Sequence, residues 1–151
     1  TLSGKIYATP LSYERTYRFL DDRLECELTV TAEETFTLER LSECLPYPLP
    51  EVKPGGLQVR LLDAQGKALP NDSEAQALYF TNESGYGHLV VFAEPRTISL
   101  GVEHTVDHYE NEREWGRALI ALPTQWEAGQ SLSLVYRLQS CAAEEVPGAL
   151  R

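Results

Sequence analysis

The sequence predicts an all-β fold, an antiparallel β-sandwich of about nine or ten strands. Three observations support this prediction: apolar and polar residues alternate along most of the chain, turn residues separate the alternating segments, and no long segment has helical periodicity. A β-barrel is the alternative way to arrange such strands. An α+β fold is a further alternative, in which residues 32–45 form a helix.

Residues 13–30 form the clearest predicted element, a hairpin with two aspartates at its tip. The alternation places Phe19 opposite Leu24 on the apolar face of the hairpin. The same register places Arg18 opposite Glu25 on the polar face. The apolar pairs and the charged pair both fit one register with a two-residue loop. The pattern therefore predicts the strands, the loop and the register of this hairpin.

The next two segments are less regular. Residues 31–45 alternate as in a strand, but they also contain a possible helix-capping box followed by leucines at helical spacing, and we favour the strand. Residues 46–56 contain alternate prolines and a glycine pair, which predict an extended path outside regular structure. This proline segment is interpreted either as a crossing between two sheets or as a docking strip for a partner protein.

The remaining strands follow at short intervals. Residues 88–93 are almost continuously apolar, which predicts a central strand covered on both faces. Pro95 and its neighbours predict a turn directly after it. The other predicted strands are residues 57–61, 78–80, 98–108, 115–122 and 132–138.

The composition predicts one domain over residues 1–139 and a flexible C-terminal tail over residues 140–151. Thirteen basic and 23 acidic side chains leave a net charge of −10, which argues against nucleic acids and anionic membranes as partners. We find no signal peptide and no apolar stretch of about 18 residues, so the localisation stays open. The chain contains no methionine, which predicts a processed protein or a module of a longer one.

The three cysteines show no CxxC spacing, so the sequence predicts neither a disulfide framework nor a zinc site. Cys26 and Cys44 are expected to be small buried side chains. Cys141 is expected to lie in the tail. A bridge between the first two cysteines remains an open alternative.

The candidate ligand-binding residues lie in a second predicted hairpin, residues 98–122. A five-residue loop over residues 110–114 would place Asp107 opposite Arg117 and Tyr109 opposite Trp115 on the outer face. Sugar rings stack on aromatic faces, and charged side chains bind sugar hydroxyls, so this group suggests a carbohydrate platform. Alternatively, these cross-strand pairs only stabilise the hairpin.

Metal and catalytic chemistry are weakly indicated. His104 and His108 would lie about 13 Å apart on a strand, too far to share a zinc ion, and we predict no metal site and no cofactor. Asp107, Glu110, Glu112 and Glu114 include enough carboxylates for a glycosidase pair. Acidic residues near a hairpin tip are more typical of a solvated sheet edge, so no catalytic residue is predicted.

Three hypotheses about function follow, and we favour the first. The chain is a non-catalytic β-sandwich module of a larger protein, with carbohydrate as the leading ligand class. The first alternative is a structural or protein–protein interaction domain that uses a sheet edge or the proline segment. The second alternative is a small glycoside hydrolase that uses the carboxylates of residues 107–114.

Overall fold

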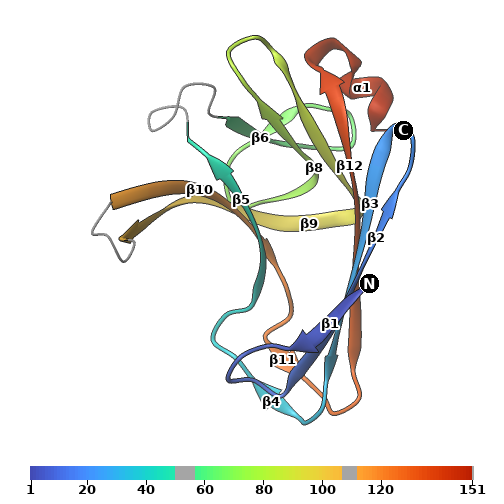
Figure 1. Ribbon diagram of the computed structural model, residues 1–151, viewed down its shortest axis with the longest axis vertical. Helices are drawn as coiled ribbons and strands as arrows, with labels where there is room; N and C mark the ends of the chain where they lie inside the picture. The colour runs from blue at the N-terminus through green and yellow to red at the C-terminus, as the bar shows by residue number, and fades with distance from the viewer. Residues whose placement is uncertain (50–56, 107–111, 151) are drawn as a thin grey trace.

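The computed structural model of the protein describes residues 1–49, 57–106 and 112–150 (Figure 1). Strands account for 66% of the residues and helices for only 5%, which confirms the all-β prediction. One antiparallel sheet of ten strands bends into two facing layers without closing into a barrel. The fold is therefore a β-sandwich, and the barrel alternative is wrong.

The large sheet contains β1 (Leu2–Lys5), β2 (Leu11–Phe19), β3 (Arg23–Ala32), β5 (Ser42–Pro48), β6 (Gln58–Leu62), β7 (Ala68–Leu69), β8 (Ser73–Thr81), β9 (Tyr86–Val106), β10 (Glu112–Ala121) and β12 (Ser131–Ala142). A small second sheet contains β4 (Phe36–Thr37) and β11 (Gln125–Trp126). The helical elements are a 3-10 turn, η1 (Ala143–Glu145), and a short helix, α1 (Val146–Ala149). Residues 32–45 contain no helix, so the α+β alternative is wrong.

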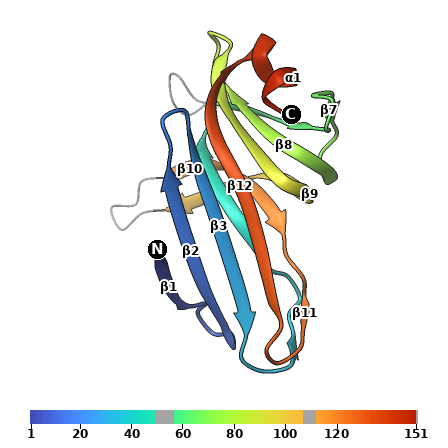
Figure 2. The ribbon, with the colours of Figure 1, turned by 90° about the vertical axis from the view of Figure 1, so that its right-hand side faces the viewer.

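The long strand β9 belongs to both layers. Its first seven residues pair with β12, and its last nine pair with β10, which in turn pairs with β5 (Figures 1 and 2). The register against β8 shifts in between, because Ala75 pairs with Arg96 whereas Ala77 pairs with Val91. The turn predicted around Pro95 is therefore wrong. Pro95 lies in an irregularity of one strand, where its missing N–H breaks no regular ladder.

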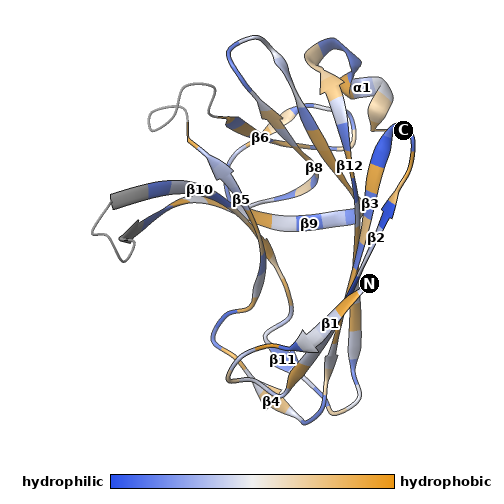
Figure 3. Ribbon diagram, in the orientation of Figure 1, coloured by the Kyte–Doolittle hydropathy of each residue, from blue (hydrophilic) through white to orange (hydrophobic). Residues whose placement is uncertain are grey.

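The first predicted hairpin is confirmed in its strands, loop and register. Phe19 pairs with Leu24, and Arg18 pairs with Glu25. The N–H of Leu20 donates to the carbonyl of Arg23 at 2.9 Å, which closes the two-residue loop. Figure 3 shows apolar and polar residues alternating along β2 and β3, as a strand with one face against the core requires.

The first part of the proline segment corrects another prediction, because Pro46 and Pro48 belong to strand β5. They pair with Arg117 and Trp115 of β10, with Tyr47 opposite Gly116 between them. Residues two apart in a strand direct their backbone nitrogens to the same side. Both prolines therefore direct their nitrogens to the free edge of β5, the edge that pairs with no other described strand, where a missing N–H costs no ladder hydrogen bond. On this edge the carbonyl of Pro48 accepts from the N–H of Leu57 at 2.8 Å. The rest of the segment, residues 50–56, lies outside the described residues.

Two apolar clusters lie on opposite faces of β9. Val90 and Phe92 belong to the main core between the two layers. Leu89 and Val91 belong to a smaller cluster on the outer face, which includes Val146 of α1. The prediction that residues 88–93 form a central strand covered on both faces is confirmed for residues 89–92, whereas His88 and Ala93 at the two ends are exposed.

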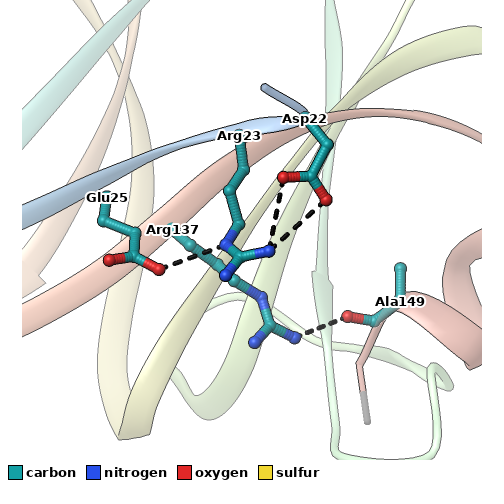
Figure 4. A network of polar contacts seen from close by, with 5 residues as sticks. All are labelled: Asp22, Arg23, Glu25, Arg137 and Ala149. Carbon is teal, nitrogen blue, oxygen red and sulfur yellow. Dashed lines mark hydrogen bonds and ion pairs between the residues drawn. The ribbon is translucent and has the colours of Figure 1, made fainter. Parts of the chain in front are cut away.

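The C-terminal residues cover the smaller apolar cluster on the outer face of β9. The sequence predicts an irregular tail from residue 140, but β12 continues to Ala142, and α1 follows at Val146. The side chain of Val146 is buried, and Arg137 donates a 2.7 Å hydrogen bond to the carbonyl of Ala149 (Figure 4). Two turns of helix are too short to show periodicity, so tertiary packing decides this segment. No described helix is long and apolar enough to cross a membrane.

All three cysteines are free thiols. Cys26 is buried as predicted, but Cys44 is exposed and Cys141 is buried, which reverses both expectations. Cys44 alternates with Glu43 and Leu45 along β5, and these neighbours face the core while it faces outward. Cys141 lies in β12 under the helical segment, where burial raises the pKa of its thiol.

An ion pair between Arg15 of β2 and Glu43 of β5 connects the two layers. One guanidinium nitrogen donates to both carboxylate oxygens, at 2.7 and 2.6 Å, although β2 and β5 are not neighbours in the sheet. Burial raises the pKa of the Glu43 carboxyl, and the charge and hydrogen bonds of Arg15 offset only part of that rise. Burial also disfavours the charged Arg15, but hydrogen bonding to Tyr17 and the charge of Glu43 outweigh it and raise the pKa of Arg15.

Trp126 closes the end of the sandwich where β4 pairs with β11, and its side chain is 2% exposed. Its indole N–H donates to the carbonyl of Pro123 at 2.8 Å, and its strand β11 pairs with β4. Pairing Trp126 with Phe36 brings two aromatic residues to the same end of the core.

Candidate functional site

The candidate site lies on the outer face of β5, β10 and the second part of β9. Along β10, Gly116, Ala118 and Ile120 are buried and face the core. The residues between them therefore face outward, and these include Trp115 and Arg117. Trp115 is 40% exposed. We call this surface the Trp115 face and define it by Trp115, Arg117, Glu103, Pro46 and Pro48.

Strand register determines the neighbours of the tryptophan. Glu103 of β9 and Pro48 of β5 lie on either side of Trp115. Arg117 lies between Gly101 and Pro46 in the adjacent row. Trp115 is thus flanked on the sheet surface by a carboxylate on one side and a proline ring on the other.

A partly exposed ion pair runs diagonally beside Trp115. Arg117 Nη1 lies 3.2 Å from Glu103 Oε2, and the two side chains are 29% and 46% exposed. Gly101, directly opposite Arg117, has open space where a side chain would project. Donors, acceptors and an aromatic surface are therefore accessible together, which is the combination that a polyhydroxylated ring needs.

The structure corrects the register predicted for this hairpin. Arg117 pairs with Gly101 and Trp115 pairs with Glu103, so neither is opposite the residue predicted for it. The predicted partners, Asp107 and Tyr109, lie outside the described residues. Of the four candidate residues, the structure places Trp115 and Arg117 on one outward face, and their role in ligand binding stays a prediction.

Sequence reasoning missed Glu103, the carboxylate that does accompany Arg117. Alternation alone places Glu103 on the same face as Trp115 once both strands are assigned. Only the observed register of β9 and β10 shows that Glu103 and Trp115 are neighbours. The local alternation fits this register and the predicted register equally well.

The two carboxylate side chains described in this hairpin, Glu103 and Glu114, lie on opposite faces. Glu114 belongs to the opposite face from Glu103, and its Oε1 lies 2.9 Å from His104 Nδ1. These two glutamates therefore cannot flank the same sugar bond as an acid and a base. Among the residues that the structure describes, no group of three His, Cys, Asp or Glu side chains is placed to hold a metal ion.

Comparisons with protein-family models, curated proteins and solved structures found no match to this chain.

Proposed function

We propose that this chain is a non-catalytic β-sandwich module that binds carbohydrate on the Trp115 face. The observation that carries the proposal is the exposure of Trp115 on a sheet surface, directly beside the Arg117–Glu103 ion pair. A bound pyranose would stack its C–H face on the indole. Its hydroxyls would accept from Arg117 and donate to Glu103.

The charge of the site and of the chain favours a neutral sugar. Arg117 and Glu103 carry opposite charges and cancel each other locally. The chain has a net charge of −10, which repels anionic polysaccharides at moderate ionic strength. Neutral hexose or pentose polymers are therefore the proposed ligand class, and sulfated or uronic acid polymers are expected to bind more weakly.

The competing explanation is that Trp115 only stabilises the sheet edge. Its ring neighbours Pro48 across the ladder, and cross-strand pairs of this kind contribute roughly 0.2–1 kcal/mol to stability. A purely structural tryptophan would change the free energy of unfolding when removed, but it would not affect sugar binding.

The experiment is a binding screen of the purified chain against neutral soluble polysaccharides, including β-glucans, xylan, mannans and galactans, by affinity electrophoresis and calorimetry. For the best ligand, Trp115→Ala is expected to weaken binding at least tenfold, or about 1.4 kcal/mol. Trp115→Phe should retain part of the affinity because it keeps an aromatic face. Arg117→Ala should weaken binding without abolishing it.

Tyr86→Ala is the matched control, because Tyr86 is also an exposed aromatic residue of β9 but lies outside the Trp115 face. It should leave sugar binding unchanged. The proposal fails if no neutral polysaccharide binds, or if Trp115→Ala binds as tightly as the wild type while remaining folded.

The two alternative functions stay predictions. The acidic residues of the hydrolase hypothesis include Asp107 and Glu110, which lie outside the described residues. The protein-interaction hypothesis invoked the proline segment, of which Pro46 and Pro48 are part of a paired strand. An interaction through a polyproline conformation would therefore have to involve residues 50–56.

A further inference from the structure

A second candidate site lies on the inner side of β5 and differs in chemistry from the Trp115 face, although Pro46 and Pro48 belong to both. β5 faces the inner side of β2, β3, β12 and β9 (Figures 1 and 2), and a pocket of about 310 Å³ lies between them. We call it the interlayer pocket. Its walls include Tyr17, Tyr47, Phe80 and Tyr136, with Leu138 on β12. The rings of Tyr47 and Phe80 meet edge to face at 5.6 Å.

The described lining residues carry no permanently charged side chain. They include no Asp, Glu, Lys or Arg, and His88 is the one imidazole among them. Burial raises the pKa of Tyr136, so its hydroxyl stays neutral. The charged groups of the neighbouring hollow, Arg15 and Glu43, are already bonded to each other. A charged ligand would therefore lose its hydration without gaining a counter-ion, which favours an uncharged occupant.

The rim formed by β5 also excludes one common type of ligand. Pro46 and Pro48 line the pocket and have no N–H groups, so this free edge cannot pair with an added peptide strand in the usual ladder. Recognition at this rim has to use apolar side-chain contacts instead. Small hydrophobic molecules bind through such contacts.

The volume sets the size of the ligand. A buried apolar cavity of about 150 Å³ is enough to bind benzene. The interlayer pocket has about twice that volume, which corresponds to roughly two aromatic rings. Edge-to-face aromatic packing in the wall suits a planar ring better than a flexible chain.

We propose that the interlayer pocket binds an uncharged aromatic small molecule of about two rings between the layers, on the inner side of β5. The ligand enters beside Tyr17 and His88, which are exposed at the surface, and packs against Tyr136 and Leu138. This inference does not depend on sugar binding, and either proposal can fail alone.

The test uses 1-naphthylamine, an uncharged fluorescent probe of two rings, with the full 151-residue chain. Its fluorescence should rise to saturation at one probe per chain, and naphthalene should displace it. The anionic two-ring probe 5-amino-1-naphthalenesulfonate should bind at least tenfold more weakly. Equal binding of the two probes would overturn the proposal, because it would indicate a non-selective apolar surface.

Leu138→Trp should fill the pocket and weaken probe binding at least tenfold. Val135→Trp is the matched control, because it lies on the same strand with its side chain outside the pocket, and it should bind as the wild type. If Leu138→Trp does not fold, Leu24→Phe tests the same wall and should give the same loss. Unchanged binding in the folded variant would overturn the proposal. Displacement of the probe by an extended apolar peptide, but not by naphthalene, would also overturn it.

Discussion

The ion pair between Arg15 and Glu43 allows a quantitative test of how the two layers hold together. Its side chains are only 26% and 11% exposed, and Nη2 of Arg15 contacts both carboxylate oxygens of Glu43. Removing one partner of a buried pair typically costs 3–5 kcal/mol, because the other charge stays buried without compensation. Since Arg15 keeps some access to water and cannot lose its proton, we expect Glu43→Leu to cost about 3 kcal/mol.

The reciprocal variant should cost less. In Arg15→Met the isolated Glu43 can take up a proton, because burial already raises its pKa, and we expect a cost of about 2 kcal/mol at pH 7. The double variant Arg15→Met/Glu43→Leu replaces both charges by apolar side chains. It should lie within about 1 kcal/mol of the wild type or be more stable, since apolar replacement of a buried pair is often neutral or favourable.

The measurement is a double-mutant cycle from urea unfolding of the four proteins. The control is the surface pair of Lys5 and Glu33, which has a similar distance of 2.7 Å but side chains 71% and 43% exposed. Lys5→Met should cost less than about 1 kcal/mol. Additive effects of Arg15→Met and Glu43→Leu in the double variant would refute the reasoning, because they would mean that the two charges do not compensate each other across the layers.

Three further predictions concern the core and its titration. A Cβ atom on Gly116 would clash with the ring of Tyr47, so Gly116→Ala should lower the free energy of unfolding by about 1–3 kcal/mol. Gly101 has open space at the same position, so Gly101→Ala should change that free energy by less than about 0.5 kcal/mol. Trp126→Ala should cost about 3–5 kcal/mol in denaturant unfolding, and a loss under 1 kcal/mol would contradict its role as the end cap. Because the pKa of Glu43 is raised above 4.5, the native state keeps this proton longer than the unfolded chain. The free energy of unfolding should therefore fall as the pH rises from 4.5 through the raised pKa of Glu43. Denaturant unfolding measured from pH 4 to 7 should show this fall in the wild type and a smaller dependence on pH in Glu43→Gln.

Local pattern was sufficient where a short loop and both strand faces constrained the same pairing. In the β2–β3 hairpin, Phe19 pairs with Leu24 and Arg18 pairs with Glu25, and the sequence alone predicts both pairs. Phe19 is nevertheless 82% exposed, because it lies at the end of its strand beside the loop. Similarly, the almost unbroken apolar run in β9 predicts a strand covered on both sides. These features depend on neighbours that are close in sequence or on the apolar content of one segment.

The register of β9 and β10 could not be obtained in the same way. Arg117 pairs with Gly101, six residues from the predicted Asp107. A shift by an even number of residues leaves every side chain on the same face, so the alternation fits both registers equally well. The candidate site was therefore predicted on the correct face for Trp115 and Arg117, but with the wrong acidic neighbour, because only the pairing identifies Glu103.

The sequence by itself determined the strand class, most of the strands, the first hairpin and the outward direction of Trp115, since these follow from the two-residue period of a half-buried strand. The tertiary structure alone decided three other features: the bend of β9 between layers, the placement of Pro46 and Pro48 at a free strand edge, and the cover that α1 provides. Each depends on which distant strand lies alongside, and a period of two carries no information about distant partners. Both candidate sites depend on such partners: the Trp115 face on the β9–β10–β5 register, and the interlayer pocket on the position of β5 across from β2 and β12.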